Sequence, residues 1–223
     1  MRMDKKGGGT SMQQRIPDAT IRRLPAYLRW LSTCNLERVT SGILGQATGF
    51  SSEQIRKDLA YFGAFGTRGV GYDVKALRQE ILRILQLDRG VRAVVVGAGH
   101  LGTALVRYVG QSRQRDLEIV AVVDNDSDII GTTIGHVSVE PIEKLEQLVE
   151  EYDIGMAVLT LPASAAVEIA ERLANAGVHA FLNFAPVPVC TKRFDVFVQQ
   201  IDLTLEMQAL SYFVQARQPH PIP

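Results

Sequence analysis

The sequence predicts an α/β protein with an N-terminal winged helix-turn-helix domain and a C-terminal Rossmann-like parallel sheet domain that ends in a helix. Three observations support this fold class. Two short helical patterns flank a turn at Gly49 and precede a glycine-rich stretch. The segment VVVGAGHLG, residues 94–102, fits a G-x-G-x-x-G loop between a strand and a helix. After it, strand and helix patterns alternate, as in a parallel sheet.

Composition is typical of a globular protein of one large or two small domains. The chain has 223 residues, of which 46% are hydrophobic and 22% charged. No apolar run approaches the roughly 20 residues that cross a bilayer. We expect residues 1–15, MRMDKKGGGTSMQQR, to form a disordered tail rather than a secretory signal. Cys34 and Cys190 form no C-x-x-C pair and the four histidines no metal spacing, which predicts a cytoplasmic protein without a metal.

The net charge of zero hides an asymmetry between the two halves. Residues 1–90 hold 15 Lys and Arg against 8 Asp and Glu, a net charge of +7. Residues 91–223 hold 9 against 16, a net charge of −7. A basic first half is typical of a domain that binds a polyanion such as DNA, although a solvated basic surface has the same composition.

Helical patterns in the first half predict three helices in succession. The first fits residues 17–33, with Pro17 in its first turn, and we expect Pro25 to kink it or to begin it. The second fits residues 41–47, with Ser41 as its N-cap. The third opens after Ser51, whose spacing to Gln54 is that of a capping box. In this third helix Ile55, Leu59 and Phe62 are expected to point inward.

The stretch GAFGTRGVGYDV after the third helix predicts a wing. Four glycines between residues 63 and 71 exclude a helix, and the flanking aromatic and apolar residues indicate a hairpin with Thr67, Arg68 and Gly69 near its tip. A plain glycine-rich loop is the alternative. An amphipathic helix over 73–88 would then link the two halves. The residues predicted to contact DNA are Ser51, Gln54, Arg56, Lys57, Tyr61, Thr67, Arg68 and Gly69.

The second half begins with the glycine loop of a dinucleotide site. A strand over 91–96 leads into GAGHLG and a helix to about residue 108. In this motif the first glycine permits the tight turn, the second admits the pyrophosphate and the third lets the helix pack on the strand. A second strand, 118–124, ends in a carboxylate suited to the adenosine ribose, which favours NAD(H) over NADP(H). The residues expected to hold the dinucleotide here are Gly97, Ala98, Gly99, His100, Leu101, Gly102, Asp124 and Asn125.

Two further strand patterns end in candidates for the nicotinamide side. A helix over 141–150 precedes a strand over 154–162, and a helix over 164–177 precedes a strand over 178–186. Ligands bind at the carboxyl ends of parallel strands. The candidates there are Thr160, Leu161, Pro162, Asn183, Phe184 and Ala185, with ordinary strand-to-loop chemistry as the alternative for each.

The tail combines an apolar helical stripe with an absence of catalytic groups. Leu203, Met207, Leu210, Phe213 and Val214 follow helical spacing, and they could complete their own domain or pack on a partner chain. No nucleophile with a base is apparent in the sequence, and no second domain remains to hold a substrate. We therefore expect the nucleotide to act as a signal and the protein not to be an enzyme.

Three segments together resemble the bacterial redox-sensing transcriptional repressor family Rex. They are SSEQIRKDLAYFGAFGTRGVGY, VVVGAGHLG and LNFAPV, and the resemblance runs from Ile16 to Arg217. It implies a homodimer with a DNA-binding domain over 16–88, an NAD(H)-binding domain over 89–192 and a dimerisation helix over 193–217 that is swapped onto the partner. It also implies that the dimer represses genes from operator DNA, leaves it when NADH rises, and binds NAD+ in the same pocket.

The resemblance further implies a polar switching trio, formed here by Arg29, Tyr108 and Asp202. Some members have Phe after that Asp, whereas this chain has Leu203, so aromatic packing on the nicotinamide is in doubt. Three other hypotheses remain open from the residues themselves. They are a small NAD-dependent oxidoreductase, a CoA-binding domain of similar layout, and a thiol switch through Cys34 or Cys190.

Overall fold

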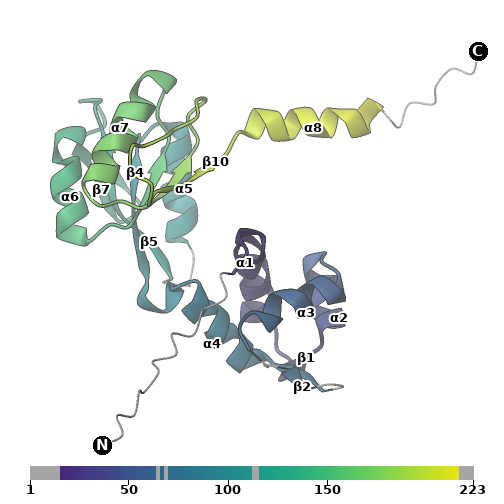
Figure 1. Cartoon of the computed structure of the whole chain (residues 1–223). Coiled ribbons are helices and arrows are strands. Elements are labelled where there is room, and N and C mark those ends of the chain that lie inside the picture. The colour runs from purple at the N-terminus through teal and green to yellow at the C-terminus, as the bar shows by residue number, and fades with distance from the viewer. Residues whose placement is uncertain (1–15, 64–65, 68–69, 112–115, 216–223) are drawn as a thin grey trace, which may run out of the picture. The chain divides into compact units, whose positions relative to one another are not determined.

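The computed structural model describes residues 16–63, 66–67, 70–111 and 116–215. The chain forms two compact units that divide between Asp88 and Arg89, here called the N-terminal and C-terminal units (Figure 1). The predicted tail over residues 1–15, together with Arg68 and Gly69 of the predicted wing tip, lies outside the described residues. Each unit is described by itself.

The N-terminal unit packs four helices around one apolar core. They are α1 (Asp18–Thr33), α2 (Ser41–Thr48), α3 (Ser52–Ala60) and α4 (Val74–Ile84). Each helix contributes residues spaced three or four apart, so that one face of each is apolar. The buried core consists of Leu24, Tyr27, Leu28, Leu31, Val39, Leu44, Ile55, Leu59, Val74, Leu77 and Ile81. The prediction for α3 is confirmed, since Ile55 and Leu59 are buried and Phe62 packs against this core.

The ends of these helices differ in part from the prediction. α1 runs through Pro25 instead of beginning there, and Pro17 precedes its first residue. Ser41 is not the N-cap of α2, because the preceding Thr40 accepts the Ile43 N–H at 3.2 Å. Ser51 does cap α3, accepting the Gln54 N–H at 3.1 Å. The predicted helix over 73–88 ends at Ile84, and a 3-10 turn over Leu87–Arg89 follows it.

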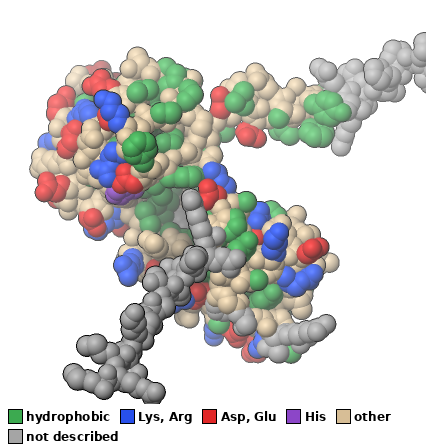
Figure 2. All heavy atoms as spheres, viewed as in Figure 1, with side chains coloured by type: hydrophobic (Ala, Val, Ile, Leu, Met, Phe, Trp, Pro, Cys, Tyr) green, Lys and Arg blue, Asp and Glu red, His purple; other side chains and the backbone are tan. Residues whose placement is uncertain are grey.

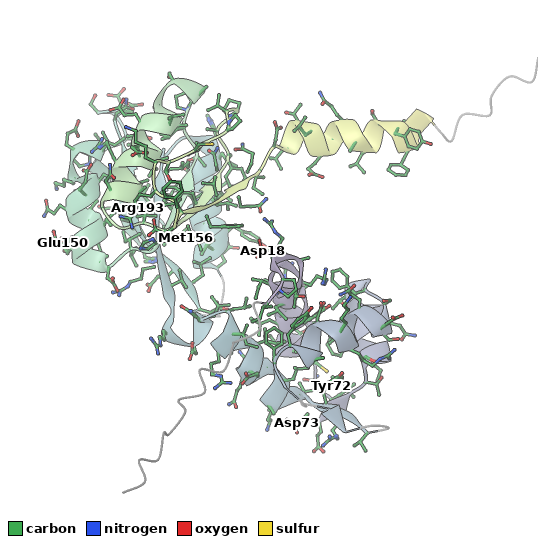
Figure 3. All side chains as sticks on the ribbon, in the orientation of Figure 1. Asp18, Tyr72, Asp73, Glu150, Met156 and Arg193 are labelled. Carbon is green, nitrogen blue, oxygen red and sulfur yellow. The ribbon has the colours of Figure 1, made fainter. Side chains whose placement is uncertain are left out.

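The predicted wing is present as an antiparallel hairpin. β2 (Gly66–Thr67) pairs with β3 (Gly71–Asp73), and β1 (Arg38–Val39) pairs with the other edge of β3. The two-residue β1 has no periodic signal of its own and was not predicted. Asp73, labelled in Figure 3, ends β3 and accepts the Ala76 N–H at 2.8 Å, so it caps α4. The wing and the last helix of the unit therefore meet at one residue.

The C-terminal unit is built on a seven-stranded sheet in the order β10-β9-β8-β4-β5-β7-β6. The strands are β4 (Val91–Val96), β5 (Leu117–Asp124), β6 (Thr133–Ile134), β7 (Val137–Pro141), β8 (Met156–Leu159), β9 (Ala180–Asn183) and β10 (Phe197–Gln200). All neighbours are parallel except β6 and β7. Without β6, this is the strand order of dinucleotide-binding folds, in which the connections reverse direction between β4 and β8.

Helices cover both faces of this sheet. α5 (His100–Gly110) packs on one face, and α6 (Leu145–Tyr152) and α7 (Ala163–Asn175) pack on the other (Figure 1). Successive side chains of β4 point to opposite faces, so Val94 and Val96 join α6 and α7 whereas Ala93 and Val95 join α5. Burial on both faces explains why residues 93–96 of β4 are all apolar, whereas Arg92 near its start is exposed.

Several elements of the C-terminal unit lie elsewhere than predicted. The predicted helix over 141–150 begins as a 3-10 turn at Ile142 and continues as α6. The strands predicted over 154–162 and 178–186 are shorter, because their ends form the loops at the carboxyl edge of the sheet. β6, β7 and β10 were missed. β10 falls inside the segment assigned to a dimerisation helix, so that helix, α8 (Leu203–Gln215), begins ten residues later than the predicted segment.

α8 carries hydrophobic side chains that nothing in the described chain covers. They are Leu203, Leu205, Met207, Leu210, Tyr212, Phe213 and Val214, all between 56% and 71% exposed. Figure 2 shows green hydrophobic side chains along this helix. No described helix is both long enough and apolar enough to span a membrane.

Candidate dinucleotide and nucleic-acid sites

In the glycine loop after β4, backbone segments approach each other too closely for side chains to fit between them. Gly97 has φ +100°, and a Cβ there would lie 2.6 Å from the carbonyl oxygen of Thr160. A Cβ on Gly102 would overlap the carbonyl oxygen of Gly97, because α5 packs directly on the loop. Above Gly99 there is open space. The turn and packing roles expected of Gly97 and Gly102 are therefore visible in the fold, whereas pyrophosphate contact at Gly99 stays a prediction.

The loop leads straight into the N-terminus of α5. The helix begins at His100, and its N-cap Gly99 offers no side chain to the first backbone N–H groups. Those groups and the helix dipole together favour an anion. Thr103 helps to hold the turn, since its hydroxyl donates to the Ala98 carbonyl at 2.8 Å. His100 and Leu101 are exposed, and their contact with a dinucleotide stays a prediction.

Asp124 lies at the carboxyl end of β5 and is tied to the glycine loop. One carboxylate oxygen accepts the Ala98 N–H at 2.5 Å. The other accepts the N–H groups of Asn125 and Asp126 at 2.7 and 2.9 Å. The sequence predicted a ribose ligand here but not this contact with the loop. The same carboxylate therefore shapes the loop and presents a negative edge beside it.

Thr160 supports the glycine loop from the next strand, β8. Its hydroxyl lies 2.7 Å from the Gly97 carbonyl and 3.0 Å from the Val96 carbonyl, and it donates to this pair. The hydroxyl hydrogen is thus used within the fold, at the point where the strand connections reverse direction. Leu161 is half-buried, and Pro162 precedes the first residue of α7. Thr160 therefore supports the glycine loop through its hydroxyl, and its contact with the nicotinamide stays a prediction.

Asn183, at the end of β9, is fully buried, and both its amide nitrogen and its amide oxygen are hydrogen-bonded. Its amide nitrogen donates to the Val187 carbonyl and the Gln200 side chain, at 2.9 and 2.6 Å, and its oxygen accepts the Ala185 N–H. The side chain therefore joins β9, β10 and the loop between them, and its contact with the nicotinamide stays a prediction. Ala185 is buried and Phe184 is half-buried, and their contacts with the nicotinamide stay predictions as well.

The outward side of α3 carries the residues predicted to contact DNA. Ser51, Arg56 and Lys57 are exposed, and Gln54 and Tyr61 are half-buried. Arg56 donates to the Ser41 hydroxyl at 3.1 Å, which gives the misassigned cap residue a different role. The other guanidinium donors of Arg56 have no partner that the structure records among described residues. Of the wing residues, only the backbone of Thr67, in β2, is described.

Asp58, on the inward side of α3, was missed by the sequence analysis. Its carboxylate has no exposed surface and accepts five hydrogen bonds, all between 2.6 and 2.9 Å, from Thr20, Arg23, Tyr27 and Gln54. Desolvation raises its pKa, but these hydrogen bonds, led by Arg23, outweigh it and lower the pKa to about 2. The signal in the sequence was the position of Asp58 between Ile55 and Leu59, on the face of the helix expected to be buried. A buried carboxylate needs hydrogen-bond partners.

Comparisons with known proteins cover both units. Residues 88–187 match the family model of a CoA binding domain, and residues 15–60 match one described as "Putative DNA-binding protein N-terminus". Two curated proteins named redox-sensing transcriptional repressor Rex are similar over nearly their whole length. The one from Natranaerobius thermophilus is 44% identical over 92% of this chain and 94% of its own, and the one from Carboxydothermus hydrogenoformans is 45% identical over 90% and 97%.

The chain belongs to the Rex family of redox-sensing transcriptional repressors.

Two solved structures of a Rex-family repressor, RSP, share the fold of this Rex chain. RSP in complex with β-NAD+ and operator DNA is 31% identical, with a TM-score of 0.82 over 92% of this chain and 95% of the other. RSP in complex with β-NADH is 29% identical, with a TM-score of 0.78 over 92% and 97%. The predicted fold class, a winged helix followed by a Rossmann-like sheet, is confirmed.

The three residues that the Rex resemblance assigned to switching lie in different elements. Arg29 is exposed on α1 in the N-terminal unit, and Tyr108 is exposed on α5 in the C-terminal unit. Asp202 directly precedes α8 and accepts the N–H groups of Thr204 and Leu205 at 2.9 and 3.2 Å. Asp202 is therefore the N-cap of α8, a role that the sequence analysis did not assign. Within the described ranges no three His, Cys, Asp or Glu side chains form a group suited to a metal ion.

Asp124→Ala is expected to weaken NADH binding by about 10- to 100-fold and to narrow the preference for NADH over NADPH. The substitution removes a charged acceptor that holds the Ala98 N–H, and such a hydrogen bond contributes about 1.5–3 kcal/mol. It also removes the charge that would repel a 2′-phosphate. Calorimetric titration with both cofactors measures the two effects. Asp126→Ala, two residues on and exposed, is the control. An unchanged NADH-to-NADPH ratio in Asp124→Ala would contradict the ribose assignment.

Proposed function

We propose that this Rex-family chain represses transcription as a homodimer on operator DNA and leaves the DNA when NADH binds, with NAD+ competing for the same site. The observation that carries the proposal is the glycine loop, which Asp124 and Thr160 hold by hydrogen bonds where the strand connections reverse direction. The same chain has a basic winged helix as its first half. The RSP complexes with NADH, and with NAD+ and operator DNA, support the same ligands here.

The N-terminal unit is the proposed DNA reader. In this proposal α3 enters a major groove, with Gln54, Arg56 and Lys57 toward bases and phosphates and Ser51 and Tyr61 beside them. Arg68, with Thr67 and Gly69, would enter the minor groove from the wing. The net charge of +7 over residues 1–90 supports binding to the phosphate backbone.

The C-terminal unit is the proposed cofactor sensor. The open space above Gly99 and the uncapped N–H groups of α5 suit the pyrophosphate, and Asp124 with Asn125 suits the adenosine ribose. The oxidised nicotinamide is cationic and the reduced ring is neutral. A sensor must bind one form better in one conformation, since equal affinity for two conformations shifts no equilibrium.

The exposed apolar α8 supports the homodimer. An uncovered helix with seven large hydrophobic residues is unfavourable in water, and a second copy of the chain can cover it through helix swapping. Two recognition helices would then meet half-sites about 34–36 Å apart. Arg29, Tyr108 and Asp202 are the proposed polar contacts that change between the DNA-bound and NADH-bound dimers. The protein would be a cytoplasmic regulator and not an enzyme, which the naming of its relatives as repressors supports.

A titration of the protein–DNA complex with cofactor tests this function. DNA is first selected from a randomised library by the full-length chain, and its binding is followed by fluorescence anisotropy. NADH is expected to release the DNA at concentrations at which NAD+ and CoA do not. Asp202→Ala is expected to keep NADH binding and to lose much of the release. Binding that is indifferent to the reduced cofactor, or release by CoA, would contradict the proposal.

A further inference from the structure

Gln54, in the first turn of α3, is tied to the buried Asp58 one turn further along. Its amide nitrogen donates to a carboxylate oxygen of Asp58 at 2.9 Å. The side chain is half-buried, so part of it stays accessible at the surface. The N-terminal residues of a recognition helix are those that meet base edges in helix-turn-helix proteins.

The chemistry of Asp58 decides which way the Gln54 amide points. An ionised carboxylate only accepts hydrogen bonds, so it can bind the NH₂ group of the amide and not its oxygen. Asp58 also accepts bonds from Thr20, Arg23 and Tyr27 of α1, which fix its position between the helices. The amide of Gln54 is therefore held in one of its two orientations before any DNA is present.

In that orientation the Gln54 amide can still form hydrogen bonds with DNA through its oxygen and one N–H group. Its oxygen keeps its acceptor sites, and its nitrogen keeps one of its two hydrogens. The major-groove edge of adenine presents a donor, N6, beside an acceptor, N7. Guanine presents two acceptors, so its O6 would face the oxygen of the held amide. Among the four bases, adenine alone offers a donor and an acceptor on one base for both remaining groups.

We propose that Gln54 reads one adenine in each half-site and that Asp58 is the positioning residue that sets this preference. The inference rests on the proposed function, because it assumes that α3 enters the major groove. Holding the amide in advance also means that little side-chain freedom is lost when DNA binds. Arg23 and Tyr27 thereby contribute to sequence preference through Asp58, without touching DNA themselves.

Base preference, measured position by position, tests the inference. The wild-type chain and Gln54→Ala each select DNA from the same randomised library, and affinities are then measured for all four bases at each position. The wild type is expected to prefer adenine at one position per half-site. Gln54→Ala is expected to lose roughly 5- to 150-fold of discrimination there and to keep the other positions, since a bidentate contact contributes about that factor.

Two further variants distinguish base recognition by Gln54 from general DNA binding and from the positioning role of Asp58. Lys57→Gln, on the exposed side of α3, is the control and is expected to weaken binding to all sequences alike. Asp58→Asn can donate to the Gln54 oxygen, which frees the amide to turn, so the preference for adenine over guanine is expected to fall. Circular dichroism and thermal unfolding establish that each variant is folded.

The outcomes of the two proposals are distinct. If the wild type selects no DNA, or keeps it in the presence of NADH, the proposed function fails. The wild type could bind DNA and release it with NADH while folded Gln54→Ala keeps the wild-type base preference at every position. Gln54 would then have only a structural role, and this inference would be overturned. A preferred base other than adenine at the position that Gln54→Ala alters overturns it as well.

Discussion

Asp58→Ala is expected to destabilise the N-terminal unit by about 3 kcal/mol, because the substitution breaks a buried ion pair and leaves its partners without an acceptor. Arg23, Tyr27 and Thr20 all donate to this carboxylate. The Arg23 side chain is 20% exposed and regains some hydration, so we expect the lower end of the usual 3–5 kcal/mol. The loss is large because a unit of this size has only about 5–10 kcal/mol of stability in total.

Thermal and urea unfolding of the full chain, followed by a probe in the N-terminal unit, measure this loss. A loss of about 3 kcal/mol corresponds to a fall in Tm of roughly 12–24 °C for a unit of 60–100 residues. Trp30, the only tryptophan in the sequence, lies on α1 and is a suitable fluorophore. Asp73→Ala is the matched control, because it removes an exposed carboxylate that caps α4 and is expected to cost about 1 kcal/mol. Equal losses in the two variants would contradict the account of Asp58.

The same carboxylate predicts the acid stability of the unit. Its pKa in the folded chain, about 2, lies below the ordinary value of 3.8. A group with a lowered pKa stabilises the fold above its ordinary pKa, and that stabilisation is lost as the pH falls toward the folded value. The wild type is therefore expected to lose about 2 kcal/mol between pH 4 and pH 2, and Asp58→Ala to lose less over the same range. Parallel pH profiles of the two chains would contradict this.

Gly102→Ala and Gly99→Ala are expected to separate the folding of the glycine loop from its ligand binding. A Cβ at Gly102 would overlap the backbone carbonyl of Gly97, which no rotamer change can relieve. We expect Gly102→Ala to destabilise the C-terminal unit by about 3 kcal/mol and to abolish NADH binding. A Cβ at Gly99 meets open space and φ there is −62°, so Gly99→Ala is expected to fold with a loss of about 1 kcal/mol or less.

The decisive measurement is NADH binding by folded Gly99→Ala. Its methyl group would occupy the space into which the pyrophosphate approaches the backbone, so NADH at concentrations that saturate the wild type is expected not to bind. Gly110→Ala, at the far end of α5, is the control, since its nearest contact is 3.8 Å away at the His136 ring. Wild-type affinity in Gly99→Ala would show that the cofactor does not lie over this loop.

Local patterns predicted most of the elements and their order. The helices of the N-terminal unit, the hairpin, the glycine loop and the strand that ends at Asp124 all have signals within a few residues of themselves. β1, β6, β7 and β10 do not, because a short strand is defined by the neighbour with which it pairs. Gln200 of β10 and Asn183 of β9 illustrate this, since their side chains bond across 17 residues of sequence.

The sequence by itself determined the family of the protein and the chemistry of the glycine loop over residues 97–102. The spacing of these glycines and of Asp124 reflects local backbone geometry, which the sequence shows directly. Only the tertiary structure decided what individual polar side chains do. Asn183 and Thr160 hold backbone together, Asp124 also supports the loop, and Asp58 orients Gln54. These roles depend on hydrogen bonds between residues that the chain brings together only by folding, and a buried polar group takes whichever partner the fold supplies.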